Sequence, residues 1–94
     1  MLEKDIEKYL RDQVKKLGGK AYKFVSPGNS GAPDRMVCLP GGRIYFVELK
    51  APGKKPTVLQ LRQMKLLRDL GFNVKVIDCK PGVDYFIQKD VLGD

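Results

Sequence analysis

The chain has 94 residues and a formal net charge of +7, from 18 basic against 11 acidic residues. A chain of this length forms one domain, so we expect residues 1–94 to be a single unit. The sequence has no apolar run that could span a membrane and no apolar signal-peptide segment, which predicts a cytoplasmic protein without a membrane partner. The excess of basic residues favours a polyanionic partner.

The first third of the chain predicts a helix, a strand and a long loop. Residues 1–17 place apolar side chains at helical spacing and end at Gly18-Gly19. Residues 21–25 predict a short strand. The loop of residues 26–33 is dense in turn-forming residues and leads directly to Asp34. Loops of this kind often carry function, and the backbone N–H groups around Ser30 could contact phosphates.

The middle of the chain predicts a β-hairpin with strands at residues 35–39 and 44–50. A Pro-Gly-Gly-Arg turn at residues 40–43 joins them, and a basic loop at residues 51–56 follows.

The last third predicts a helix, a strand and a tail. Thr57 and Gln60 have the spacing of a capping box that opens the helix, and Gly71 closes it. Residues 72–76 alternate as a strand, and residues 83–92 form either a terminal helix or an extra strand. The predicted order is therefore αβββαβ plus a tail.

Two acids flank the predicted hairpin. Folding it about its Gly-Gly centre places Asp34 opposite Glu48 or Leu49, where Cβ atoms are about 4.5–5.5 Å apart. Carboxylates this close repel each other unless a cation lies between them. Lys50 is two residues beyond Glu48 and therefore shares its face of the strand. The spacing suits a divalent metal held by two acids with an ammonium beside it, although a cross-strand ion pair would produce it too.

The residue types that are missing narrow the chemistry. The chain has no histidine and two cysteines, which excludes an ordinary tetrahedral zinc site and the Ser-His and Cys-His nucleophile schemes. Carboxylates, lysine and a hard, oxygen-preferring metal such as Mg²⁺ or Mn²⁺ remain. Basic residues surround the acidic centre along the chain and predict phosphate contacts, with ordinary surface charge as the alternative for each: Lys23, Arg35, Lys54, Lys55 and Arg62.

These motifs together resemble a known family. The predicted αβββαβ order carries Gly31-x-Pro33-Asp34-Arg35, then Phe46-Val47-Glu48-Leu49-Lys50, with Glu3 before them and Gln60 after them. This combination is similar to the VRR-NUC (virus-type replication-repair nuclease) branch of the PD-(D/E)XK superfamily, over nearly the whole chain. The resemblance implies an α/β, restriction-endonuclease-like fold with a mixed central sheet flanked by helices.

The resemblance also implies a site. Asp34 and Glu48 would be metal-binding acids with the backbone carbonyl of Leu49, and Lys50 would be the catalytic lysine. Glu3 would be the acid of the first helix, with Glu7 as its rival one turn later. Gln60 would be the helix glutamine, although its capping box is a competing structural role.

The resemblance further implies a Mg²⁺- or Mn²⁺-dependent endonuclease, phage- or prokaryote-encoded, that acts as a homodimer on Holliday junctions or other branched DNA. Three alternatives stay open: a flap nuclease, a non-selective DNA nuclease, and a DNA-binding module of the same fold without catalysis. The tail residues Tyr85, Phe86 and Ile87 could form a dimer surface or could pack in the core.

Overall fold

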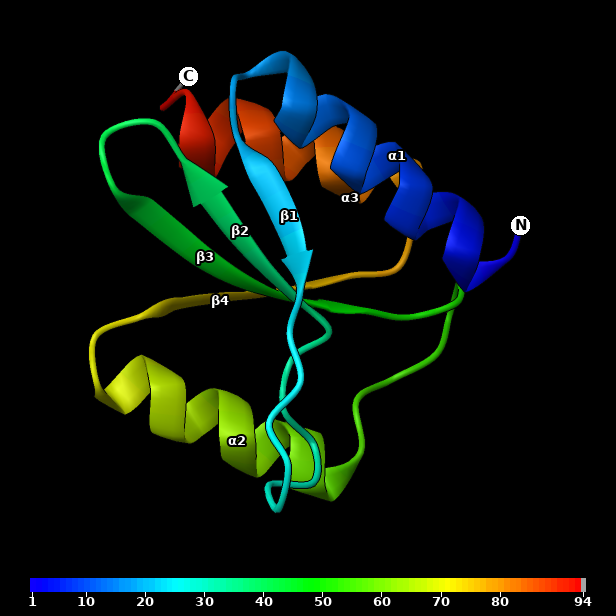
Figure 1. Cartoon of the computed structure of the whole chain (residues 1–94). Coiled ribbons are helices and arrows are strands. Elements are labelled where there is room, and N and C mark those ends of the chain that lie inside the picture. Colours follow the sequence, from blue (N-terminus) through cyan, green and yellow to red (C-terminus); the bar gives the residue numbers. More distant parts are fainter. Residues whose placement is uncertain (94) are drawn as a thin grey trace.

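The computed structural model describes residues 1–93 and confirms the predicted α/β class and αβββαβ order (Figure 1). The tail is helical, so the alternative of an extra strand is wrong. The elements are α1 (Glu3–Lys16), β1 (Lys20–Lys23), β2 (Arg35–Leu39), β3 (Arg43–Leu49), α2 (Val58–Asp69), β4 (Asn73–Ile77), α3 (Lys80–Tyr85) and η1, a π-helical continuation of α3 (Phe86–Val91).

The strands form one mixed sheet in the order β1-β2-β3-β4. β1 pairs antiparallel with β2, β2 antiparallel with β3, and β3 parallel with β4. The predicted hairpin is present, with Leu39 paired to Arg43 across the turn. Gly41 and Gly42 have φ values of 86° and 75°, a left-handed conformation in a hairpin turn that glycine adopts without steric cost.

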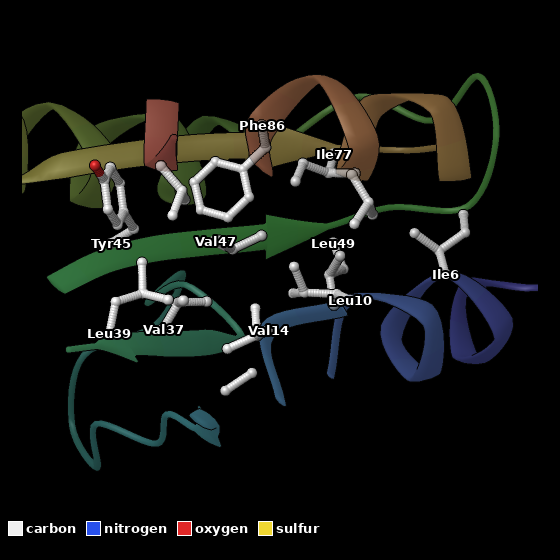
Figure 2. Packing of buried hydrophobic residues seen from close by; sticks show 13 residues of the cluster. Ile6, Leu10, Val14, Val37, Leu39, Tyr45, Val47, Leu49, Ile77 and Phe86 are labelled. Carbon is white, nitrogen blue, oxygen red and sulfur yellow. The ribbon is translucent and has the colours of Figure 1, made fainter. Parts of the chain in front are cut away.

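One face of the sheet carries the main core. α1, α3 and η1 cover this face (Figures 1 and 2). Ile6, Leu10 and Val14 of α1 are fully buried, and their spacing of four residues puts them on one side of the helix. Phe86 is buried here and Ile87 packs against the same cluster, so the alternative of core packing holds for both residues.

α2 covers the opposite face, over a smaller cluster of Phe46, Met64 and Val74. Leu61 of this helix and Leu70, its C-cap, are exposed and do not contribute to the cluster. The face of α2 that packs on the sheet carries Gln60, Met64 and Leu67. Its first turn directs a polar side chain, Gln60, toward Glu48. No helix within residues 1–93 is long and apolar enough to cross a membrane.

Candidate active site

The candidate site lies at the edge of the sheet where β3 ends. Arg35 pairs with Val47, so the next pair along the hairpin brings Asp34 opposite Glu48, one of the two positions that the turn geometry left open. Val47 packs in the main core, and side chains alternate along a strand. Glu48 therefore points to the other face, toward α2, and Asp34 shares that face. One Asp34 oxygen, Oδ2, accepts a hydrogen bond of 2.9 Å from the backbone N–H of Leu49.

Glu48 is the central residue of the site and only 1% exposed. Its Oε2 atom accepts a 2.6 Å hydrogen bond from Nε2 of Gln60 and lies 3.4 Å from Nζ of Lys50. Its Oε1 atom is buried without a hydrogen-bond partner among the described residues. Unpaired buried oxygens are rare in folded proteins, because losing water without a replacement costs free energy. One side of this carboxylate is therefore occupied and the other is available to a ligand.

Burial also changes the protonation of this group. Removal from water raises the pKa of Glu48 to about 7, and the negative charge of Asp34 pushes it in the same direction. The Lys50 ammonium opposes both effects without cancelling them. A cation beside Glu48 and Asp34 would favour the ionised form of both carboxylates.

The residues fit a hard cation. Two carboxylates meet at one position, one of them with a free oxygen, and the donor atoms are the oxygens that Mg²⁺ and Mn²⁺ prefer. Within residues 1–93 no group of three or more acidic or thiol side chains is close enough to hold a metal. The acids of α1 thus do not join Asp34 and Glu48 in one cluster.

The two acids of α1 have different surroundings. Glu3 is exposed in the first turn of the helix. Glu7 forms an ion pair with Arg35, with 2.6 Å between Oε1 and Nη2. Arg35, predicted as a DNA contact, thus has an internal partner and is only 12% exposed at its side chain. Sequence reasoning missed this pair, because nothing in the local pattern relates a helix position to a strand nearly thirty residues later.

The loop before Asp34 is docked against the first turn of α2. A Cβ added at Gly31 would lie 2.6 Å from the backbone carbon of Leu59 and 2.8 Å from the backbone nitrogen of Gln60. Pro33 is fully buried between this contact and Asp34. One contact therefore holds together the loop that delivers Asp34 and the helix turn that delivers Gln60. The capping box is also present, since Gln60 uses its Oε1 for Thr57 and its Nε2 for Glu48.

The remaining predicted DNA contacts are all exposed. Lys23 ends β1 at the site, Ser30 lies in the docked loop, and Lys54 and Lys55 lie in the loop after Lys50. Arg62 is exposed on the outer side of α2. Asp78, which sequence reasoning missed, accepts a 3.3 Å hydrogen bond from the N–H of Gly53 in the basic loop. Its place after β4 was a usable signal, because parallel strands end at the same edge of a sheet.

Comparisons with known proteins identify the family of this chain. A protein of Acyrthosiphon pisum secondary endosymbiont phage 1, named "Putative nuclease p44", is 59% identical over 76 residues, which cover 81% of this chain and 82% of the phage protein. A solved structure described as a VRR_NUC domain superposes with a TM-score of 0.87 at 38% identity, covering 94% of this chain and 97% of its own. No family model matches the sequence. The identity, the coverage and the shared fold together show that this chain belongs to the VRR-NUC family of nucleases.

Proposed function

We propose that this protein is a Mg²⁺- or Mn²⁺-dependent DNA endonuclease that hydrolyses phosphodiester bonds, with branched DNA and above all the four-way junction as its substrate. The observation that carries the proposal is the buried, unpartnered Oε1 of Glu48 opposite Asp34, with the ammonium of Lys50 beside the same carboxylate. The family supports nuclease activity. The metal, the substrate class and the roles below are the proposal.

Each residue of the site has a proposed role. A metal bound by Asp34, Glu48 and the carbonyl of Leu49 would supply an activated water and neutralise charge on the scissile phosphate. Lys50 holds its ammonium 3.4 Å from Glu48, where it can orient the attacking water and offset charge that develops on the phosphate. Gln60 binds Oε2 of Glu48 and so leaves Oε1 directed to the metal. Glu3 would act on the metal through a water.

DNA is the proposed partner because of the charge distribution. The protein carries +7. Exposed Lys23 pairs with Arg35 next to Asp34, and exposed Lys54 and Lys55 lie in the loop that follows Lys50. Basic side chains supply phosphate affinity while the acidic centre performs the chemistry. The presence of Asp34, Glu48 and Lys50 in adjacent positions supports catalysis over a DNA-binding module of the same fold without it.

The proposal is tested by incubating the protein with a labelled four-way junction, a flap and a linear duplex of equal length, each with Mg²⁺, Mn²⁺ or EDTA. We expect cleavage of the junction with either metal, much weaker cleavage of the linear duplex, and no cleavage in EDTA. Asp34→Asn is the matched control, because it keeps the size of the side chain and removes its charge.

The other outcomes are informative. Equal cutting of all three substrates by the wild type, with an inactive Asp34→Asn, would show a non-selective nuclease. Faster cutting of the flap than of the junction would show that the flap is the preferred substrate and would refute the junction proposal. Cutting in EDTA, or equal activity of Asp34→Asn, would refute the metal site.

A further inference from the structure

The side chain of Arg35 lies on the opposite face of the sheet from the side chains of Asp34 and Glu48. It pairs with Val47, whose side chain is in the core under α1, whereas Asp34 and Glu48 face α2. Its guanidinium joins three elements: Nη2 is 2.6 Å from Glu7 of α1, and Nη1 donates a 3.3 Å hydrogen bond to the carbonyl of Ala21 in β1. A side chain placed there is directed away from the cleavage site.

The surroundings make the guanidinium depend on Glu7. The Arg35 side chain is 12% exposed, and its Nε atom is buried without a partner among the described residues. A largely buried cation is tolerated only where an opposite charge compensates for the lost water. Glu7 supplies that charge, and it is itself only 32% exposed. The pair therefore differs from the solvated ion pair between Lys8 and Asp12 on the same helix.

The position of Arg35 connects this pair to the site. Arg35 is the first residue of β2, and Asp34 precedes it by one peptide bond. Asp34 itself accepts a 2.8 Å hydrogen bond at its carbonyl from the N–H of Phe24 and a 2.9 Å bond at Oδ2 from the N–H of Leu49. The Arg35 side chain adds contacts to α1 and β1 at the next residue, where β2 begins.

From this geometry we infer that Glu7 and Arg35 are positioning residues, which fix α1 to the start of β2 and so hold Asp34 opposite Glu48. Glu7 acts as the partner of Arg35 and is not a metal ligand, and Arg35 does not contact DNA. The inference rests on the proposed function, because Asp34 is positioned for the metal.

The test measures Mn²⁺ binding by calorimetry, together with kcat, KM for a four-way junction and the melting temperature. The variants are Glu7→Gln, Arg35→Lys, Arg35→Gln and the charge swap of Glu7→Arg with Arg35→Glu. We expect Glu7→Gln and Arg35→Gln to weaken Mn²⁺ binding and lower kcat by about tenfold, as for other residues that orient metal ligands. KM should be unchanged, since neither residue contacts DNA. Arg35→Lys and the charge swap should bind Mn²⁺ more tightly and have a higher kcat than Arg35→Gln, although both values stay below those of the wild type.

Asp12→Asn is the control, because it removes an exposed ion pair of α1 and should leave Mn²⁺ binding and kcat unchanged. A Glu7→Gln defect that the swap does not repair would identify Glu7 as a ligand and overturn the inference. A higher KM in Arg35→Lys would identify a DNA contact and overturn it too. Lower melting temperatures with normal Mn²⁺ binding and kcat would show that the pair only stabilises the fold, and would overturn the positioning role.

The wild type and Asp34→Asn separate this inference from the proposed function. If wild-type protein binds Mn²⁺ and cuts DNA, and Asp34→Asn does neither, the site stands and the variants above decide the positioning role. If wild-type protein neither binds Mn²⁺ nor cuts any DNA, both proposals fall together.

Discussion

Glu48 is a carboxylate in a position that favours its neutral form. It is buried, it faces a second acid, and only one of its oxygens is hydrogen-bonded. Ionising such a group costs free energy in the absence of a cation, and a bound cation would offset that cost. Gln60 and Lys50 both contact the hydrogen-bonded oxygen, Oε2, and so leave Oε1 as the oxygen that a cation would contact.

The pKa of Glu48 predicts how stability depends on pH. Its folded-state pKa of about 7 lies above the ordinary value of 4.5, so the folded protein holds an extra proton between these values. The stabilisation from that proton is complete below pH 4.5 and is lost as the pH rises to about 7. In EDTA the melting temperature of the wild type should therefore contain a contribution that falls as the pH rises from 4.5 to about 7. The Glu48→Gln variant should lack this contribution.

Thermal unfolding monitored by circular dichroism checks this prediction. Asp69→Asn, an exposed acid paired with Lys65 on α2, should keep the wild-type dependence. Mn²⁺ binding requires the ionised carboxylates, so its affinity should rise over the same pH range. An identical pH profile for wild type and Glu48→Gln would contradict the assigned protonation.

Lys50 should contribute to the cleavage step and little to DNA binding. Its side chain is 15% exposed and is directed to Glu48, so few of its contacts are available to a phosphate in the ground state. We expect Lys50→Ala to lower kcat at least about 100-fold, as for other groups that stabilise charge developing in the transition state. DNA affinity in EDTA, measured by fluorescence anisotropy, should change little. Lys50→Ala with normal turnover would remove this residue from the chemistry.

At the scale of the elements, the site depends on loop 26–33 and on α2. Neither element belongs to the sheet edge itself, yet one close backbone contact at Gly31 joins them and places Asp34 and Gln60 on the same side. α2 buries little apolar surface of its own, with Met64 as its one buried side chain. The docking of the loop is therefore a substantial part of what holds this helix over Glu48.

Gly31→Ala should separate the loop from α2. The substitution adds the cost of a positive φ of 88°, about 1–2 kcal/mol for a residue with a side chain, and a Cβ that overlaps the Leu59 backbone. Gly28→Ala is a matched control in the same loop, because its φ is 82° but its Cβ would meet nothing within 4 Å. Chemical denaturation should show a larger loss of stability for Gly31→Ala, accompanied by lower kcat. Equal losses would show that the contact is unimportant.

At the scale of the whole molecule, basic residues are placed at the edge that carries the acidic pair. Lys23 pairs with Arg35 at this end of the β1–β2 ladder, whereas Lys20 pairs with Cys38 at the far end. The loop with Lys54 and Lys55 follows the end of β3 and is tied to Asp78 through Gly53. Lys23, Lys54 and Lys55 are therefore the proposed phosphate contacts at this end of the sheet.

Salt titrations of DNA binding test this placement. Each phosphate contact that is lost should reduce the slope of log K against log salt by about 0.9 for duplex DNA. We expect Lys54→Ala and Lys55→Ala each to reduce the slope by up to this amount and Lys20→Ala to leave it unchanged, measured in EDTA to prevent cleavage. Equal effects of all three variants would indicate a diffuse charge effect without a defined path for DNA.

Cleavage of a four-way junction needs two cuts, and each chain carries one site. A symmetric dimer is the simplest arrangement that places two sites on a two-fold substrate. In wild-type dimers, a cruciform plasmid should be converted directly to the linear form. Dimers that mix wild-type chains with Asp34→Asn chains should produce nicked circles instead. Light scattering of the free protein measures the oligomer, and a monomer at all concentrations that still linearises the plasmid would contradict the predicted homodimer.

Much of this protein was predictable from its sequence. The spacing of Ile6, Leu10 and Val14, the Gly41-Gly42 turn and the capping box at Thr57 are local signals, because each depends on neighbours a few residues apart. The turn also limited the residue opposite Asp34 to Glu48 or Leu49, since a tight turn determines the register of a hairpin. The structure decides for Glu48.

Only the tertiary structure decided how distant elements meet. The pairing of Glu7 with Arg35, the contact of Gly31 with α2 and the bond from Gln60 to Glu48 join residues from separate elements. The same holds for Phe86, which the sequence left between surface and core and which packing buries. Local sequence determines which elements form and how a hairpin pairs, whereas contacts between elements depend on how their faces fit. That is why the acidic pair was visible in the sequence and its supports were not.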